Sequence, residues 1–263
     1  MTYESIRFSV EDGVAHIVLA RAKQANTVNL AFAKELRDAV EKCKADDNVR
    51  AVLLSAEEGP IFSAGGDLGG FAAYGEKLPE KMQDMMDEFH VPIQTLSEID
   101  APLVVAVNGV AAGAGFSMVL SASIVIASEN ARFSMAYTGA GLTPDGSSTY
   151  FLPKIVGLRR AEELMVTNRQ LSAQEALEWG IVNQLVDETE LMEKALKTAK
   201  RLAKGPSKAY GNVRRLLLSS YDTDLFVQLQ REGESIVEMT KTADGKEGIA
   251  AFLEKRRPAF KGQ

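Results

Sequence analysis

The chain has 263 residues, of which 46% are hydrophobic and 25% are charged, which is typical of globular proteins and excludes a disordered or fibrous chain. Its formal net charge of −6 argues against nucleic acid as the main partner, and its single cysteine, Cys43, cannot form an internal disulfide. No apolar run is long enough to span a membrane, and the first ten residues lack a signal-peptide pattern. We therefore expect a soluble cytoplasmic protein with no membrane partner.

The first half of the chain alternates apolar runs with glycine-containing turns and helical patterns. Residues 6–19 alternate on both sides of Asp12-Gly13, which predicts a β-hairpin. Hydrophobic spacing predicts strands at 51–55, 103–107 and 124–127 and helices at 30–45 and 81–98. Strands that are apolar throughout and alternate with helices indicate an α/β fold in which helices cover the sheet.

From Arg159 onward the pattern becomes almost entirely helical. The exception is a possible strand at 181–186, and Gly205-Pro206 is typical of a helix stop followed by a helix start. We predict an α/β core at residues 1–204 and a helical C-terminal region at residues 205–263. Because no low-complexity linker separates them, we expect the two parts to pack together.

Two loops rich in small residues each follow a predicted strand. They are Ser63–Asp67 and Asn108–Gly115. Two such loops could direct two backbone N–H groups at one oxygen and so form an oxyanion hole, which stabilises an enolate or a tetrahedral anion. Either loop alone is equally consistent with glycines that only allow tight turns and close helix packing.

An acidic residue, Asp145, directly follows Pro144 and precedes a predicted helix. This position suits an ordinary helix N-cap, which is the simpler interpretation of Asp145 by itself. The alternative is a catalytic carboxylate. We expect no metal site, because His16, His90 and Cys43 lack the spacing of metal ligands.

Five segments together resemble the crotonase (enoyl-CoA hydratase/isomerase) superfamily, over nearly the whole chain. They are FSAGGDL at 62–68, VNGVAAGAG at 107–115, GLTPDGSSTYFLP at 141–153, LSAQEALEWGIV at 171–182 and AFLEKRRPAF at 251–260. The phrase PDGSSTYFLPKIVG is most similar to phenylacetate-pathway isomerases that act on a ring-derived acyl-CoA. The resemblance implies a spiral of repeated ββα units with a helical C-terminal part. It also implies a homotrimer or a dimer of trimers, assembled through that part.

The resemblance assigns roles to particular residues. Ala64 and Ala114 match the residues whose N–H groups hold the thioester oxygen, and Asp145 matches the catalytic aspartate of the isomerase branch. Further matches imply that the acyl-CoA is bound by Lys23, Ala25, Ala64, Gly66, Asp67, Leu68, Tyr137, Phe252 and Lys255. Phe252 and Lys255 correspond to positions that often enclose the nucleotide of a neighbouring subunit. Coenzyme A is part of the substrate, so we expect no separate cofactor.

The two glutamates with which hydratases of the family position water correspond here to Ser117 and Tyr137. Neither residue is a carboxylate base, so the sequence disfavours hydration. The remaining acid, Asp145, predicts an isomerase in which one carboxylate, in an apolar pocket, removes an allylic proton and returns it further along the chain.

Three alternatives remain open. In a hydrolytic aroyl-CoA dehalogenase, Asp145 would attack the ring as a nucleophile and His90 would activate water; His90 could instead only line the pocket. An enoyl-CoA hydratase is the second alternative. The third is a non-catalytic acyl-CoA-binding homologue, which a solvent-facing Asp145 would favour.

Overall fold

The predicted N-terminal hairpin forms the edge of a six-stranded sheet. The computed structural model describes residues 2–263, and in it β1 (Ile6–Glu11) pairs antiparallel with β2 (Val14–Leu19). Asp12 and Gly13 have φ values of 52° and 78°, the left-handed conformation that a two-residue hairpin loop requires. The hairpin prediction is therefore confirmed.

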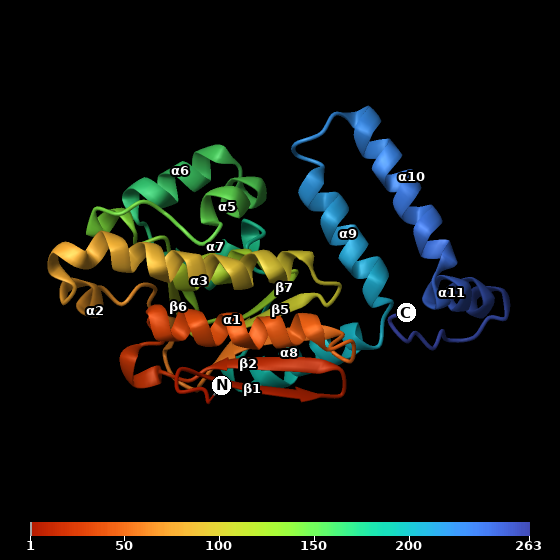
Figure 1. Cartoon of the computed structure of the whole chain (residues 1–263), viewed down its shortest axis with the longest axis horizontal. Helices are drawn as coiled ribbons and strands as arrows, with labels where there is room; N and C mark the ends of the chain where they lie inside the picture. The colour runs from red at the N-terminus through yellow and green to blue at the C-terminus, as the bar shows by residue number, and fades with distance from the viewer. Residues whose placement is uncertain (1) are drawn as a thin grey trace.

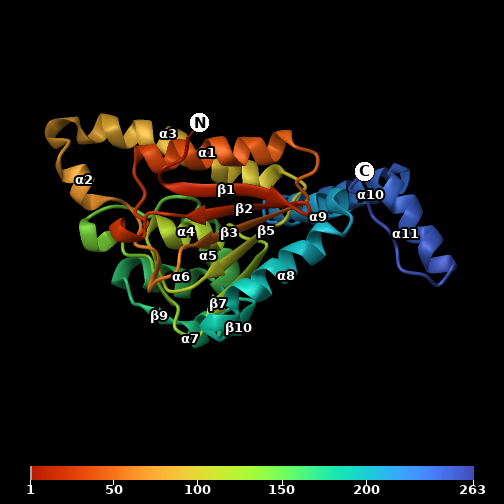
Figure 2. The same cartoon turned by 90° about the horizontal axis from the view of Figure 1, so that it is seen from below.

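Two sheets, whose strands come from successive repeats, make up the core of the molecule (Figures 1 and 2). The six-stranded sheet has the order β1-β2-β3-β5-β7-β10 and is parallel from β2 onward, and the four-stranded sheet has the order β4-β6-β8-β9. Beyond the hairpin, the strands are β3 (Ala51–Ala56), β4 (Ile61–Ser63), β5 (Leu103–Val107), β6 (Val110–Ala112), β7 (Ile124–Ser128), β8 (Arg132–Ser134), β9 (Leu171–Ser172) and β10 (Gln184–Val186). Each of β3, β5 and β7 is followed by a strand of the smaller sheet and then a helix, which confirms the α/β fold of repeated ββα units.

Helices cover both faces of the larger sheet. In the body they are α1 (Leu30–Ala45), α2 (Leu68–Ala72), α3 (Leu78–Glu98), α4 (Ala114–Leu120), α5 (Ser148–Val156), α6 (Leu158–Thr167), α7 (Ala173–Glu178) and α8 (Leu191–Ala203). Short 3-10 turns lie at Ala22–Gln24, Gly75–Lys77, Thr138–Ala140 and Glu188–Glu190. Helices α1 and α3 lie side by side over one face, and α8 lies on the other (Figure 2). In β3, Val52 and Leu54 join the core under α1, whereas Leu53 joins the core under α8, so both faces of the strand are buried and Ser55 is its one polar residue.

The C-terminal helices project from this body. They are α9 (Ser207–Ser219), α10 (Leu225–Lys241) and α11 (Ala243–Leu253), and both views show them as an arm (Figures 1 and 2). The guanidinium of Arg50 fixes the base of the arm by donating to the Ser207 hydroxyl (3.2 Å), the Phe260 carbonyl (3.1 Å) and the Gly205 carbonyl. The helical C-terminal part is confirmed, while the boundary at 204/205 stays a prediction.

A check of helix length and hydropathy over residues 2–263 finds no helix able to cross a lipid bilayer.

Candidate active site

An apolar cavity of about 330 Å³ brings both small-residue loops together with Asp145. It lies between the loop before α2, the start of α4, the N-terminal half of α3 and the loop before α5. Most of the wall is apolar and includes Val28, Phe71, Met82, Met85, Met86 and Phe89. The Asp145 side chain is 29% exposed and lines this cavity. Asp145 therefore faces an apolar pocket, as expected, while part of its side chain stays exposed.

Helix α3 supplies one wall through residues at helical spacing. Met82, Met85, Met86 and Phe89 follow an i, i+3, i+4, i+7 pattern, which places them on one face of the helix. Phe89 is fully buried. The next residue of the helix, His90, contacts Asp145. Methionine side chains are flexible and polarisable, so this wall can adapt to acyl groups of different shapes.

The backbone amides that face the cavity differ in one position from the expectation. The Ala64 N–H donates to the Ala25 carbonyl at 2.9 Å, so it is not available to a thioester, and the prediction of Ala64 as a donor is wrong. Two residues later, the Gly66 N–H makes no hydrogen bond to residues 2–263, and the same is true of the Ala114 N–H at the start of α4. Both residues line the cavity. The two free amides are therefore those of Gly66 and Ala114.

The two loops approach closely because glycines remove the side chains between them. Gly65 has φ +90°, and a Cβ there would lie 2.8 Å from the Ala112 carbonyl oxygen. A Cβ at Gly115 would lie 2.6 Å from both the Cβ and the carbonyl oxygen of Ser63. The glycines therefore allow the two loops to pack tightly. This packing brings the amides of Gly66 and Ala114 to one cavity.

Three hydroxyl groups hold the backbone of Asp145. Its carbonyl oxygen accepts hydrogen bonds from Ser117 Oγ at 2.7 Å, Ser148 Oγ at 2.9 Å and Tyr137 OH at 3.3 Å. Tyr137 OH also lies 3.0 Å from Ser117 Oγ. Burial raises the pKa of Tyr137 to about 12, so the phenol keeps its proton and can donate.

These contacts change the interpretation of several residues. The N-cap of α5 is Ser147, so the interpretation of Asp145 as a helix N-cap is wrong. Ser117 and Tyr137 occupy the positions of the two hydratase glutamates, and their hydroxyls support the loop that carries Asp145. No local sequence pattern indicates this role, since the contacts join residues 8 to 28 positions apart.

The carboxylate of Asp145 contacts one titratable side chain. His90 Nε2 lies 2.7 Å from Asp145 Oδ1, and the His90 side chain is 53% exposed. The structure therefore joins the two residues that the sequence left as separate candidates. A carboxylate and an imidazole at this distance can exchange a proton.

The residues expected to bind the acyl-CoA are not all near the cavity. Leu68 and Tyr137 line it, and Asp67 sits beside it, where its side chain caps α2 by accepting from the Gly70 N–H at 3.1 Å. Lys23 and Ala25 lie in the segment that packs against the first loop, with Lys23 exposed.

Phe252 lies on α11 and Lys255 just beyond it. This helix lies at the opposite end of the molecule from α2 (Figures 1 and 2). One copy of the chain therefore does not bring Phe252 and Lys255 to its own cavity.

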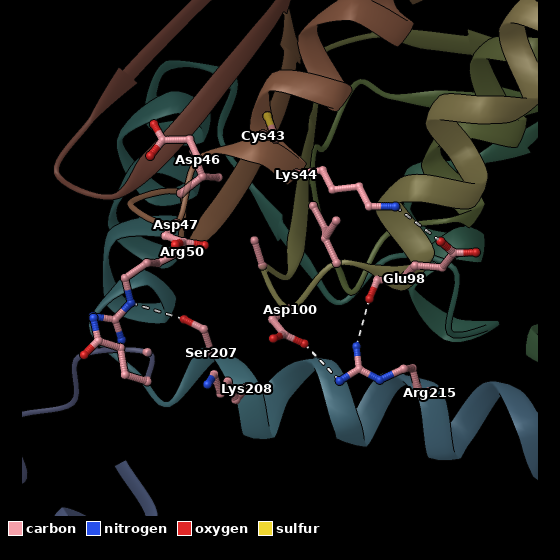
Figure 3. A pocket seen from close by; sticks show the side chains of 15 residues that line it. Cys43, Lys44, Asp46, Asp47, Arg50, Glu98, Asp100, Ser207, Lys208 and Arg215 are labelled. Atoms are coloured by element: carbon pink, nitrogen blue, oxygen red, sulfur yellow. Dashed lines mark hydrogen bonds and ion pairs between the residues drawn. The ribbon is translucent and has the colours of Figure 1, made fainter. Parts of the chain in front are cut away.

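A larger cavity, of about 580 Å³, lies between the C-terminal ends of α1 and α3 and the start of α9 (Figure 3). Two ion pairs join charged side chains in its lining: Arg215 with Asp100 at 2.9 Å, and Lys44 with Glu98 at 3.9 Å. Burial raises the pKa of the Cys43 thiol to about 12, so this thiol is unreactive near neutral pH. The cavity is a junction between the body and the C-terminal arm, and it lacks the apolar wall that an acyl group requires.

Comparisons with known proteins agree with this geometry. The sequence model described as enoyl-CoA hydratase/isomerase matches residues 9–263. The chain is 35% identical, over 100% of both chains, to a Rhodobacter capsulatus protein named probable enoyl-CoA hydratase. It is also 35% identical to the 1,2-epoxyphenylacetyl-CoA isomerase of Escherichia coli, over 99% of both.

More distant relatives carry other activities. The 4-chlorobenzoyl coenzyme A dehalogenase-2 of an Arthrobacter species is 31% identical over 93% of this chain and 88% of its own.

Among solved structures, an enoyl-CoA hydratase/isomerase from Mycobacterium abscessus superposes with a TM-score of 0.92 at 34% identity, covering 98% of this chain and 100% of that chain. The chain belongs to the enoyl-CoA hydratase/isomerase family, the crotonase superfamily, and within it resembles the phenylacetate-pathway branch.

Proposed function

We propose that the chain is an acyl-CoA isomerase that shifts a double bond, or rearranges a ring-derived acyl group, through a thioester enolate. One observation carries the proposal: within residues 2–263, Asp145 is the only carboxylate that lines the apolar cavity, and it shares that cavity with the free amides of Gly66 and Ala114. One base beside an oxyanion hole is the minimum that an allylic proton shift requires.

The mechanism follows from these positions. The thioester oxygen binds between the Gly66 and Ala114 amides, and Asp145 removes an allylic proton. The negative charge spreads onto the thioester oxygen, where each donor contributes about 2.7–4 kcal/mol in comparable sites. The carboxyl group of Asp145 then protonates the distant carbon. Coenzyme A acts as part of the substrate, and the proposal includes no further cofactor.

Hydration is less well supported because it needs two groups that position water. The hydroxyls of Ser117 and Tyr137, which replace the glutamates, contact the backbone of Asp145. A purely non-catalytic binding role is also less well supported, since Asp145 faces the cavity.

A hydrolytic aroyl-CoA dehalogenase remains the second candidate, and one contact favours it. His90 Nε2 lies 2.7 Å from Asp145 Oδ1, close enough to activate a water molecule at an ester formed on Asp145. The Arthrobacter dehalogenase among the relatives is consistent with this alternative. The cavity offers the aromatic rings of Phe71, Phe89 and Tyr137, but most of the wall that α3 contributes consists of flexible methionines, which hold a ring less rigidly.

Turnover assays with a panel of CoA thioesters test the proposal. Enoyl, ring-derived and haloaroyl thioesters are supplied, and isomerised, hydrated and dehalogenated products are measured. We expect isomerised product from wild-type protein and none from Asp145→Asn, which should still bind acyl-CoA because it keeps the shape of the side chain. Halide release with a covalent adduct on Asp145, detected by mass spectrometry, would establish the dehalogenase instead.

A further inference from the structure

A second cavity lies beyond Asp145. It has a volume of about 380 Å³, and Asp145 is the only residue that lines both this cavity and the apolar one. Its lining mixes apolar residues with Gln94, Ser97 and Ser147. The carboxylate therefore lies between the apolar cavity, which suits an acyl group, and the second cavity, which is more polar.

His90 belongs to the second cavity and not to the first. Its Nε2 contacts Asp145 Oδ1 at 2.7 Å, while Nδ1 makes no hydrogen bond to any part of the chain that the structure describes. More than half of the side chain is exposed. One ring nitrogen is thus bonded to the proposed base, and the other is available to water.

The second cavity is also suited to hold water. Ser147 Oγ is buried there and has no hydrogen-bond partner within residues 2–263, and its residue has a left-handed φ of 71°. This oxygen is shielded from solvent, but the polar side chains of Gln94 and Ser97 line the same cavity as the imidazole and can hydrogen-bond water there.

We propose that the second cavity and His90 form a proton relay that connects Asp145 to solvent while the acyl group fills the apolar cavity. The inference rests on the proposed isomerase function. Asp145 takes a proton from the allylic carbon, and Oδ1 of the protonated acid then donates to Nε2 of a neutral His90 that carries its hydrogen on Nδ1. Transfer of this proton to Nε2 gives an imidazolium, which releases the Nδ1 proton to water. The reverse path brings a solvent proton to Asp145, which gives it to the distant carbon of the enolate. No electrons are lost or gained, and one substrate hydrogen is exchanged for one solvent hydrogen.

A relay and a single base closed off from solvent differ in the hydrogen that the product carries. If Asp145 simply returned the proton it took, the product would keep the original hydrogen. With the relay, turnover in D2O places deuterium on the newly protonated carbon. His90 acts through Asp145, so it is a positioning and relay residue, and isotope incorporation reports on this role separately from the overall rate.

The experiment follows a thioester that the wild-type protein isomerises, in D2O, and measures deuterium in the product by mass spectrometry. We expect most wild-type product to carry deuterium, and His90→Gln to lower the ratio of exchange to direct transfer by on the order of 10²-fold, the lower range for a positioned acid–base group. Ser97→Ala is the matched control, because it alters the same cavity and helix but keeps the His90–Asp145 contact.

A second variant tests the relay independently, in case His90→Gln fails to fold. Leu218→Trp fills the second cavity from α9 without changing His90 or Asp145, and it should also lower the incorporation of deuterium. Wild-type product free of solvent deuterium, or undiminished incorporation in both variants, would overturn the relay. Absence of isomerised product from any thioester would instead overturn the proposed function, which the wild-type assay in H2O shows separately.

Discussion

At the scale of single residues, Gly66 holds its amide at the cavity at a position where Phe71 leaves no room for a side chain. A Cβ at this position would lie 2.9 Å from Cε2 of Phe71. We expect Gly66→Ala to displace the amide and to lower kcat by about 10²–10³-fold, the effect of losing one oxyanion donor. Steady-state kinetics on the substrate found in the panel measure this change.

Two further variants make the test specific to that contact. Phe71→Leu in the Gly66→Ala background removes the ring that the new Cβ meets, so it should restore part of the activity. Ala64→Gly should stay near wild type, because the Ala64 amide is already bonded to the Ala25 carbonyl. A loss in Ala64→Gly as large as that in Gly66→Ala would contradict the assignment of the donors.

Ser117 and Tyr137 also act at this scale. Because their hydroxyls hold the Asp145 backbone, we expect Ser117→Ala and Tyr137→Phe each to lower kcat with little change in KM. Each loses about 0.5–1.5 kcal/mol of hydrogen bonding, equivalent to about a tenfold rate loss at most. The double variant should cost less than the sum of the two single variants, since the two hydroxyls contact one another. Strictly additive losses measured by kinetics would argue against a shared support.

The sequence alone identified the loops but not which amide is free. Small residues mark Ser63–Asp67 as a close-approach loop, yet the Ala64–Ala25 hydrogen bond joins positions 39 residues apart, and local pattern carries no information on such a contact. For the same reason Asp145 resembled an N-cap: the preceding Pro144 and following helix are local features, whereas Ser117, Tyr137 and His90 meet it only through the fold.

At the scale of elements, Gly115 lets α4 begin against the first loop. A Cβ there would lie 2.6 Å from the backbone of Ser63, so we expect Gly115→Ala to lower the free energy of unfolding by about 1–3 kcal/mol, the usual cost of overpacking. Denaturant unfolding followed by circular dichroism measures it. Gly233→Ala in α10 is the control, because nothing lies within 4 Å of its Cβ position and alanine favours the helix by about 1 kcal/mol. Equal effects at both positions would contradict the packing argument.

Long elements with strong periodicity could be predicted from sequence, and short ones could not. The helix at 30–45 and the strand at 103–107 match α1 and β5 because each forms a continuous hydrophobic pattern. The strands of the smaller sheet have two or three residues each, too few for alternation to show. Helix α2 contains two glycines and depends on the Asp67 cap, so its own sequence disfavours it.

At the scale of the whole molecule, the partly buried His16 links folding to pH. Its Nε2 lies 2.9 Å from Ser55 Oγ between β2 and β3, and burial together with the nearby Arg7 lowers its pKa below the ordinary 6.5. The unfolded chain therefore binds a proton at a higher pH than the folded chain does. Stability should be complete above pH 6.5 and should fall, by at most about 1.4 kcal/mol per pH unit from this group, as the pH drops toward the lower folded pKa. Unfolding of wild type and His16→Gln between pH 7 and 5 measures this, and parallel profiles would exclude His16.

The C-terminal arm raises the question of assembly. Helix α10 has no buried residue in the single chain, and its Phe226 is 87% exposed, whereas soluble proteins rarely leave such a large apolar surface uncovered. Phe252 is 83% exposed, and its helix lies far from the cavity of its own chain. We propose that the arm forms a homotrimer or a dimer of trimers and that Phe252 and Lys255 complete the nucleotide site of a neighbouring copy.

This arrangement predicts a defect that depends on the nucleotide part of the substrate. Phe252→Ala should raise KM for a full CoA thioester and leave KM for the matching N-acetylcysteamine thioester unchanged, because the shorter substrate lacks the nucleotide that Phe252 would contact. Phe226→Asp should lower the mass measured by light scattering and reproduce the same KM defect, since a dissociated chain cannot supply its neighbour. If Phe226→Asp gave a monomer with unchanged KM for the full thioester, each chain would bind its own nucleotide, and the arm would serve assembly alone.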